Sequence, residues 1–197
     1  FDAALLTQWR RSAMDFFRDN NMGAMVVDDN SYSMVFAGDG STVTTTRPIN
    51  RQFAMGAYSG YKGQHCAAVV CVSSVCGLVV ATSRVHGGHD NDITVMENSA
   101  FNAVLNDGVL RARLLADPVR PDYIIACDSI FSETTYRATT TRIHASAAER
   151  QRSKALSAFR VQIEHSFTEL KSYFKKLKFG DGLRWGQQLV EPIIIIS

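Results

Sequence analysis

The stretch that decides how the chain is interpreted is CAAVVCVSSVCGLVVATS, residues 66–83. Two apolar, β-branched runs, Cys66–Val72 and Leu78–Ser83, stand on either side of the polar pair Ser73-Ser74. Such runs around a short polar break are typical of a β-hairpin whose strands are buried. The chain therefore contains a sheet, and its other elements have to be placed around that hairpin.

Further strands and helices are predicted on both sides of the hairpin. In chain order they are an amphipathic helix over 3–18, a strand over Tyr32–Ala37 that ends at Gly38-Asp39-Gly40, a strand over Thr42–Thr46, a loop over 47–56, a loop over Val85–Asp92, a helix over about 93–106, a strand over Tyr123–Cys127 and a long helix over Ser153–Phe179. This order predicts a single α/β domain with a mixed sheet flanked by helices. We expect the domain to span 25–180, with an N-terminal helix in 1–24 and a tail in 181–197 that resembles a truncated element.

Composition excludes several classes of protein. With 197 residues, 46% hydrophobic residues and a formal charge of +2, the chain has the profile of a folded domain and not of a disordered one. No window approaches the roughly 20 apolar residues of a membrane span. The four cysteines lack the spacing of a zinc site, so we expect reduced thiols in an intracellular protein. Three of them are expected in the core: Cys66, Cys71 and Cys76.

Three carboxylates stand at positions where they could converge. Asp39 and Asp128 follow predicted strands, and Glu164 lies beside the apolar face of the last helix. Converging carboxylates repel one another unless a cation neutralises them, and hard oxygen ligands suit Mg²⁺ or Mn²⁺. Two such ions activate a water and stabilise the leaving oxygen of a phosphodiester. Taken singly, each carboxylate also fits a helix cap or a solvated surface group.

Five short blocks, in order, resemble the transposase-derived DDE nucleases of the PIF/Harbinger group. They are DGSTVTTTRP (39–48), YSGYKGQH (58–65), GGHDN (87–91), DSIF (128–131) and RVQIEHSF (160–167). Between Asp128 and Glu164 lie 35 residues, which suits the spacing of that superfamily. The chain departs from the family pattern at Cys127, which replaces a glycine, at Phe131, an aromatic one position early, and at Thr168, which replaces the glycine after Phe167.

The resemblance implies an RNase H-like fold and metal-dependent cleavage of DNA, with joining of the freed 3′-hydroxyl to target DNA in an active element. It implies that Asp39, Asp128 and Glu164 are the catalytic residues and hold divalent metal, as two Mg²⁺ or Mn²⁺ ions. Asp28 and Asp29 are weaker alternatives for the first ligand, because their distance to Arg47-Pro48 does not fit the family. The resemblance also implies a nuclear location and a separate DNA-binding domain or partner protein. It is compatible with assembly as a homo-oligomer.

Several basic residues are expected to contact nucleic acid. They are Arg47, Lys62, His65, Lys171, Lys175 and Lys178. Glu164, Thr168 and the three lysines of the last helix share one stripe, and residues 149–178 hold eight Lys or Arg against three Asp or Glu. A basic row that leads to a catalytic carboxylate suits a phosphate backbone, although it also suits a solvated helix face.

The role of His89 and Asp90 stays open, and so do two rival functions for the domain. His89 and Asp90 could contact a metal or DNA, or they could cap their loop and the following helix. The whole domain could be a catalytically inactive relative that acts as a DNA-binding or protein-interaction module. It could also be an RNase H-like hydrolase that acts on RNA or on a hybrid, since the metal site would be shared.

Overall fold

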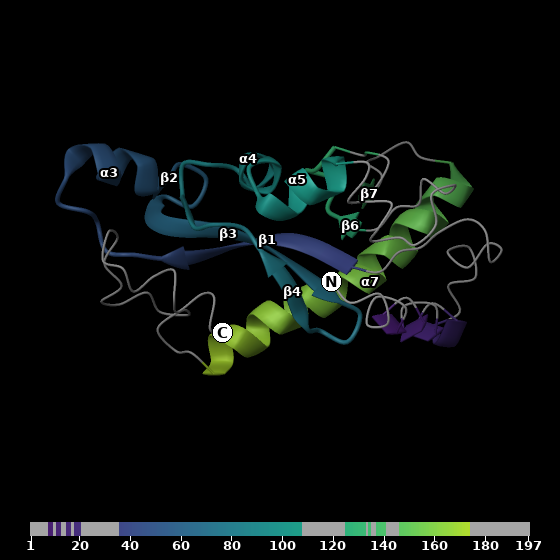
Figure 1. The fold of residues 1–197 in the computed structure, drawn as a ribbon. Helices are drawn as coiled ribbons and strands as arrows, with labels where there is room; N and C mark the ends of the chain where they lie inside the picture. The colour runs from purple at the N-terminus through teal and green to yellow at the C-terminus, as the bar shows by residue number, and fades with distance from the viewer. Residues whose placement is uncertain are drawn as a thin grey trace.

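The computed structural model describes residues 8–9, 11–12, 15–16, 18–20, 36–107, 125–132, 134, 137–140 and 146–173. Its elements are β1 (Phe36–Thr44), α3 (Arg51–Ala57), β2 (Tyr58–Ser59), β3 (Gln64–Ser74), β4 (Val79–Thr82), β5 (His86–Gly87), α4 (Asp92–Glu97), α5 (Ala100–Asn106), β6 (Ile125–Cys127), β7 (Arg137–Thr139) and α7 (Ala147–Tyr173). Figure 1 shows the long helix α7 crossing one side of the sheet, while α4 and α5 lie on the other side. The predictions for Asp28, Asp29, Lys175, Lys178 and the tail fall outside the described residues.

The sheet has an antiparallel half and a parallel half, joined at β1. β3 pairs antiparallel with the whole length of β1, from the pair Phe36↔Ser74 to the pair Thr44↔Cys66. On the other edge of β1, β6 is parallel to β1 and β7 is parallel to β6. The described strands follow the order β2-β3-β1-β6-β7, and β4 and β5 also pair with β3. The predicted class, an α/β domain with a mixed sheet and flanking helices, is confirmed.

Asp39 lies in the middle of β1, so the prediction that Gly38-Asp39-Gly40 ends a strand was wrong. The glycines allow close approach of neighbouring groups and do not form a turn. A Cβ on Gly38 would lie 3.0 Å from Ile125 Cγ2, and a Cβ on Gly40 would overlap the carboxylate of Asp92. One continuous strand therefore replaces the two that the glycines suggested.

β3 is buried on both faces, which explains its nearly unbroken apolar sequence. Ala67, Val69 and Cys71 belong to the cluster under α7, whereas Ala68, Val70 and Val72 belong to the cluster on the opposite face. The alternation follows the two-residue period of a strand. β3 thus contributes three buried side chains to each core layer.

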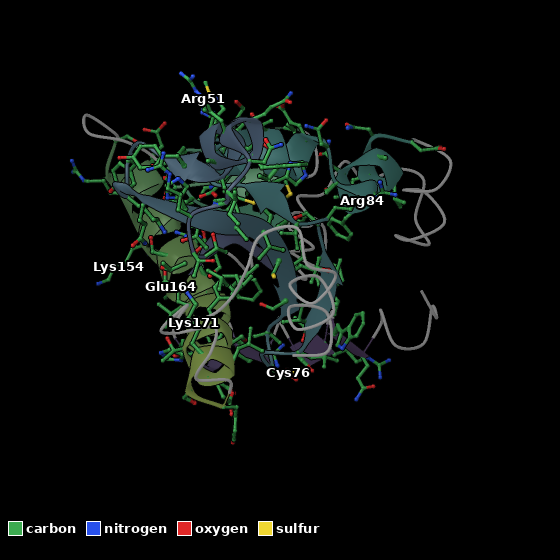
Figure 2. The ribbon with its side chains drawn as sticks, turned by 90° about the vertical axis from the view of Figure 1, so that its left-hand side faces the viewer. Arg51, Cys76, Arg84, Lys154, Glu164 and Lys171 are labelled. Atoms are coloured by element: carbon green, nitrogen blue, oxygen red, sulfur yellow. The ribbon has the colours of Figure 1, made fainter. Side chains whose placement is uncertain are left out.

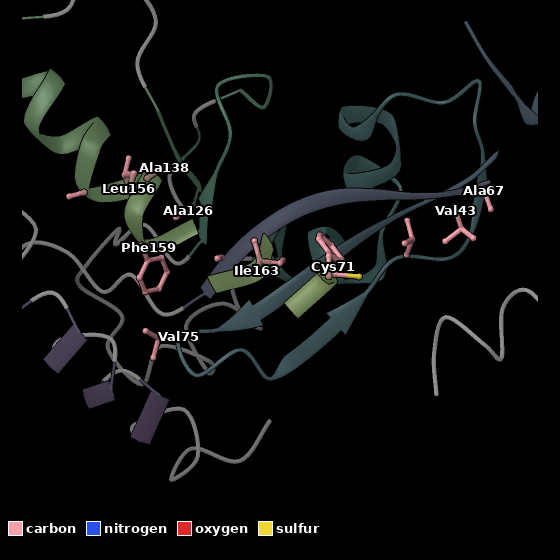
Figure 3. Close-up of a cluster of buried hydrophobic side chains, with 13 residues drawn as sticks. Val43, Ala67, Cys71, Val75, Ala126, Ala138, Leu156, Phe159 and Ile163 are labelled. Carbon is pink, nitrogen blue, oxygen red and sulfur yellow. The ribbon is translucent and has the colours of Figure 1, made fainter. Parts of the chain in front are cut away.

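The core under α7 depends on a few large side chains. Figure 3 shows Leu156, Phe159 and Ile163 of α7 within the cluster that contains Cys71 and Val43 of the sheet. The Phe16 ring meets the Phe159 ring edge-on at 5.7 Å between centroids. On the opposite face, buried residues of the sheet pack against α4 and α5, and the described positions of the N-terminal helix add Trp9. Burial of the large apolar side chains on these faces is the main stabilising term.

Several local predictions need correction. The predicted loop over 47–56 contains most of α3, which starts at Arg51 and is capped by Asn50, whose side chain accepts the N–H groups of Gln52 and Phe53. The predicted helix over 93–106 is two helices, because Ser99 caps a new helix start. Cys76 is exposed and not in the core, since it lies in the β3–β4 turn beside Gly77 at φ +82°. The helix predicted from Ser153 begins six residues earlier, at Ala147, and the short strands β2, β5 and β7 were not predicted.

Replacing Phe159 by alanine tests the packing of α7. The Phe159 side chain is fully buried, and removing a buried phenylalanine side chain costs about 3–5 kcal/mol. We expect the free energy of unfolding, measured by urea denaturation, to fall by that amount. Ser157→Ala, at an exposed position of the same helix, should change it by less than about 0.5 kcal/mol. Equal effects of the two substitutions would contradict the described packing.

Candidate active site

Asp39 presents its carboxylate to α7 from the middle of β1. Its Oδ1 accepts the N–H of Gly40 at 2.9 Å, and its Oδ2 accepts from Arg160 Nη2 at 3.2 Å. The side chain is 20% exposed. Burial raises the pKa of the Asp39 carboxyl, and the Arg160 guanidinium offsets only part of that rise, while Glu164 and Asp128 add to it.

Asp128 directly follows β6, and the sheet register places it opposite Asp39. Ala37 pairs with Ala126, and each aspartate stands two residues further along its strand, so both side chains point to the same face. Asp128 Oδ1 accepts the N–H of Ser129 at 2.6 Å and lies 3.4 Å from Thr140 Oγ1, whose hydroxyl donates to it. The carboxyl end of β6 therefore delivers the second carboxylate to the site.

Glu164 comes from α7, one helical turn after Arg160. Its Oε1 lies 3.9 Å from Arg160 Nη2, and its side chain is more than half exposed. Figure 2 shows Glu164 and Lys171 on the same side of α7. Of the three carboxylates, Glu164 is the most accessible to solvent.

Arg160 is the residue that all three carboxylates share. Its Nη2 contacts Asp39 and Glu164, and its Nη1 lies 3.6 Å from Asp128 Oδ1. Because Asp39 and Glu164 contact the same nitrogen, their oxygens lie no further apart than the sum of 3.2 and 3.9 Å. The structure thus brings the three predicted site residues together.

Arg160 is a site residue for which the sequence pattern indicated no role. Its side chain is 9% exposed, and its Nε is buried without a hydrogen-bond partner among the described residues. Arg160 follows Phe159 and precedes Ile163 on the buried side of α7. A charged residue on the apolar face of a helix was the available signal, because a buried charge requires paired anions.

Asp92 is a fourth carboxylate beside the site, and sequence reasoning missed it. It is the first residue of α4 and packs over the backbone of Gly40, next to Asp39. Burial raises the pKa of the Asp92 carboxyl; Lys62 lowers it in part and Asp128 raises it further. Gly40 turns to the face of the sheet opposite the Asp39 side chain, so Asp92 lies on the α4 side of β1, close enough to Asp128 for the two charges to interact.

The neighbouring His89 and Asp90 do not join the three carboxylates. His89 is exposed, and Asp90 Oδ2 lies 3.0 Å from His86 Nδ1. Asn91, and not Asp90, caps α4, because its side chain accepts the N–H of Thr94. The capping role predicted for Asp90 was wrong.

The residues predicted to contact nucleic acid lie at different places. Lys62 donates a hydrogen bond to Thr42 Oγ1 on β1. Its positive charge lowers the pKa of the Asp92 carboxyl. Lys171 is half-buried; burial lowers the pKa of its ammonium group, and the nearby charge of Lys62 lowers it further. Arg47 is exposed, and the His65 ring meets the Tyr58 ring at 5.3 Å. Within the described part of the chain, Lys62 and Lys171 are therefore the pair that the fold brings close together.

The donor set suits a divalent cation, although the carboxylates contact Arg160 in this arrangement. In the ranges that the structure describes, no three His, Cys, Asp or Glu side chains form a group that could hold a metal ion. Asp39, Asp128 and Glu164 nevertheless carry three negative charges against the single positive charge of Arg160. Carboxylate oxygens are the ligands that Mg²⁺ and Mn²⁺ prefer. The site has the chemistry to accept an ion if the carboxylates give up part of their contact with the guanidinium.

Comparison with known proteins gives one match. A family described as DDE superfamily endonuclease matches residues 38–189, a range that includes Asp39, Asp128 and Glu164. No curated protein and no solved structure matches the chain. Among the described residues, no helix has the length and apolar character needed to cross a membrane.

The raised pKa of Asp39 predicts how stability depends on pH. A carboxyl with a higher pKa in the folded protein than in the unfolded chain binds its proton more tightly when folded, so ionising it destabilises the fold. Relative to Asp39→Asn, the wild type should therefore lose stability as the pH rises above the ordinary carboxyl value of 3.8.

Urea denaturation at a series of pH values measures this difference directly. Glu97→Gln, at an exposed position of α4, serves as the control and should follow the wild type. A constant difference between wild type and Asp39→Asn at all pH values would contradict the described burial of this carboxyl.

Proposed function

The chain belongs to the DDE superfamily endonuclease family, and we propose that it is a metal-dependent DNA endonuclease with an RNase H-like catalytic domain. Its mixed sheet with flanking helices is the architecture expected of such a domain. The observation that carries the proposal is the convergence of Asp39, Asp128 and Glu164 on Arg160 from β1, the end of β6 and α7. Three elements far apart in sequence deliver the carboxylates that this chemistry requires.

We assign Asp39 and Asp128 as the residues that hold the divalent ions, and Glu164 as the residue that completes the site. Bound Mg²⁺ or Mn²⁺ supplies activation of a water and stabilisation of the leaving oxygen of a phosphodiester. Asp39 is held in place by the Gly40 N–H, and Asp128 by the Ser129 N–H. Both carboxylates are thus oriented before an ion or a substrate arrives.

In this proposal, Arg160 is a positioning residue. The guanidinium contacts each of the three carboxylates and partly neutralises their mutual repulsion. A carboxylate cluster without this cation would contain three negative charges within a few ångströms, and Asp39 would take up a proton more readily. Arg160 therefore keeps the carboxylates ionised and close together.

Lys62 and Lys171 are proposed contacts for the phosphate backbone. The two ammonium groups lie near enough for Lys62 to influence the pKa of Lys171, so a phosphate between them would relieve their repulsion. Arg47 and His65 remain candidates on sequence grounds, together with Lys175 and Lys178. A DNA strand that follows this surface would pass from Glu164 along α7.

The finer parts of the proposal concern the subtype of the family. The five blocks that resemble the PIF/Harbinger group favour a transposase-derived enzyme that acts in the nucleus and joins 3′-hydroxyl ends to target DNA. A separate DNA-binding domain or partner would then select the sequence that is cut. Assembly as a homo-oligomer would bring two DNA ends together.

One observation favours a second candidate function. Arg160 already contacts all three carboxylates, and none of the described groups of ligand-type residues is arranged as a metal site. A relative in which this ion-pair network is permanent would bind DNA or protein without cleaving it. The two functions differ in one measurable property, which is cleavage that depends on a divalent ion.

Nicking of supercoiled DNA in the presence of Mg²⁺ or Mn²⁺ tests the proposal. Because loss of even a supporting contact to a metal ligand typically costs 10- to 100-fold, Asp128→Ala should reduce the nicking rate by about 100-fold or more. Glu169→Ala, at an exposed position of α7, should nick like the wild type. A wild type that nicks no faster than Asp128→Ala would favour the inactive module.

A further inference from the structure

Large apolar side chains are exposed together on one segment of the chain. They are Ile49, Phe53, Met55, Tyr58 and Tyr61, and we refer to them as the α3 surface. Tyr61 is 97% exposed and Phe53 is 60% exposed. Single exposed apolar residues are ordinary, but five within thirteen consecutive positions indicate a binding surface.

The segment is held firmly, so these side chains are not exposed through loss of structure. α3 buries only the small residues Ala54 and Ala57. Its end is fixed because the N–H of His89 donates to the carbonyl of Gly56 at 3.0 Å. β2 pairs with the start of β3. The helix therefore turns its small face to the protein and its large side chains to solvent.

The segment that forms the α3 surface carries only basic charges, and the acidic residues nearest to it in the fold are Asp90, next to the His89 that bonds to Gly56 of α3, and Asp92, whose pKa Lys62 lowers. Arg47, Arg51 and Lys62 stand among the apolar residues, and residues 40–89 contain no Asp or Glu at all. Figure 2 shows Arg51 at the periphery of the molecule. A mixture of exposed aromatic rings and cations is typical of surfaces that bind single-stranded nucleic acid.

β1 runs from the candidate active site toward the α3 surface. Figure 1 shows α3 and β2 together at the end of the sheet where β1 finishes. Thr44, the last residue of β1, is five residues beyond Asp39, which corresponds to about 17 Å along a strand. Lys62 bonds to Thr42 between them.

We propose that the α3 surface stacks against unpaired bases of the DNA strand that leaves the active site. This inference rests on the proposed function, because it takes DNA as the substrate. Bases inside an intact duplex present their faces to one another, whereas unpaired bases present them to aromatic side chains. Phe53, Tyr58 and Tyr61 supply the rings, and the neighbouring cations hold the phosphates. The domain then prefers DNA that is frayed or single-stranded beside the cut.

Binding of fluorescently labelled oligonucleotides without divalent ions tests this inference apart from cleavage. The probes are a 20-nucleotide single strand and a duplex of the same sequence, measured by fluorescence anisotropy. Tyr61→Ala should weaken binding of the single strand by about 5- to 150-fold, the range for one lost base–aromatic contact. Binding of the duplex should change less than about twofold. Tyr61→Phe, which keeps the ring, should restore single-strand binding.

Two control variants separate stacking from charge and from general surface effects. Leu78→Ala removes an exposed apolar side chain in the β3–β4 turn and should leave both affinities unchanged. Lys62→Ala should lower the slope of log affinity against log salt by about 0.7 on the single strand, because one phosphate contact is lost. Tyr61→Ala should leave that slope unchanged, since stacking releases no counterions.

Three results would overturn the inference. They are equal loss of single-strand and duplex binding in Tyr61→Ala, no loss in either, or a change in sedimentation that shows the α3 surface to be a contact between protein chains. The nicking assay distinguishes these from failure of the proposed function. A wild type that nicks DNA while Tyr61→Ala binds the single strand normally refutes the α3 surface alone, and a wild type that neither nicks nor binds DNA refutes the proposed function.

Discussion

The Arg160 side chain is only 9% exposed, so its charge has to be paired with anions, because an unpaired buried charge costs several kcal/mol. In this protein the anions come from three elements: Asp39 from β1, Asp128 from the end of β6 and Glu164 from α7. The pairing ties the long helix to the centre of the sheet and fixes the relative positions of the carboxylates. The same contacts that satisfy Arg160 thereby assemble the candidate active site.

The sequence predicted the carboxylates better than the backbone that holds them. Asp128 and Glu164 could be placed because one follows an apolar strand and the other lies beside the apolar stripe of a helix. Asp39 was identified, but its strand was cut at Gly38 and Gly40, because glycine between β-branched runs usually marks a turn. The actual reason for both glycines is the close approach of Ile125 and Asp92, and such contacts between distant segments leave no local pattern in a sequence.

Arg160 and Asp92 were missed for a related reason. Arg160 appeared only as one letter of a family motif, since its role depends on three residues that the fold brings to it. Asp92 directly follows a polar stretch where a carboxylate is ordinary, and only the fold brings its charge near Asp128. The short strands β2, β5 and β7 were missed because two or three residues carry no periodicity.

In the proposed enzyme, the two halves of the sheet have different roles. The parallel half, β1 with β6, carries the carboxylates that we propose to hold the ions. The antiparallel half extends away from them to α3 and β2, where aromatic and basic residues are exposed. α7 spans the distance and brings Lys171 near Lys62. A nucleic acid would thus meet the chemistry at one point of the surface and its binding contacts at another.

The most direct test of the central claim is the position of an ion in crystals of the domain grown with Mn²⁺. We expect an anomalous difference peak within about 2.5 Å of carboxylate oxygens of Asp39 and Asp128, with the Arg160 guanidinium moved away from at least one of them. Crystals of Asp128→Ala should lack the peak. Crystals at high Mn²⁺ concentration in which the three carboxylates keep their contacts with Arg160 and no peak appears beside them would contradict the account.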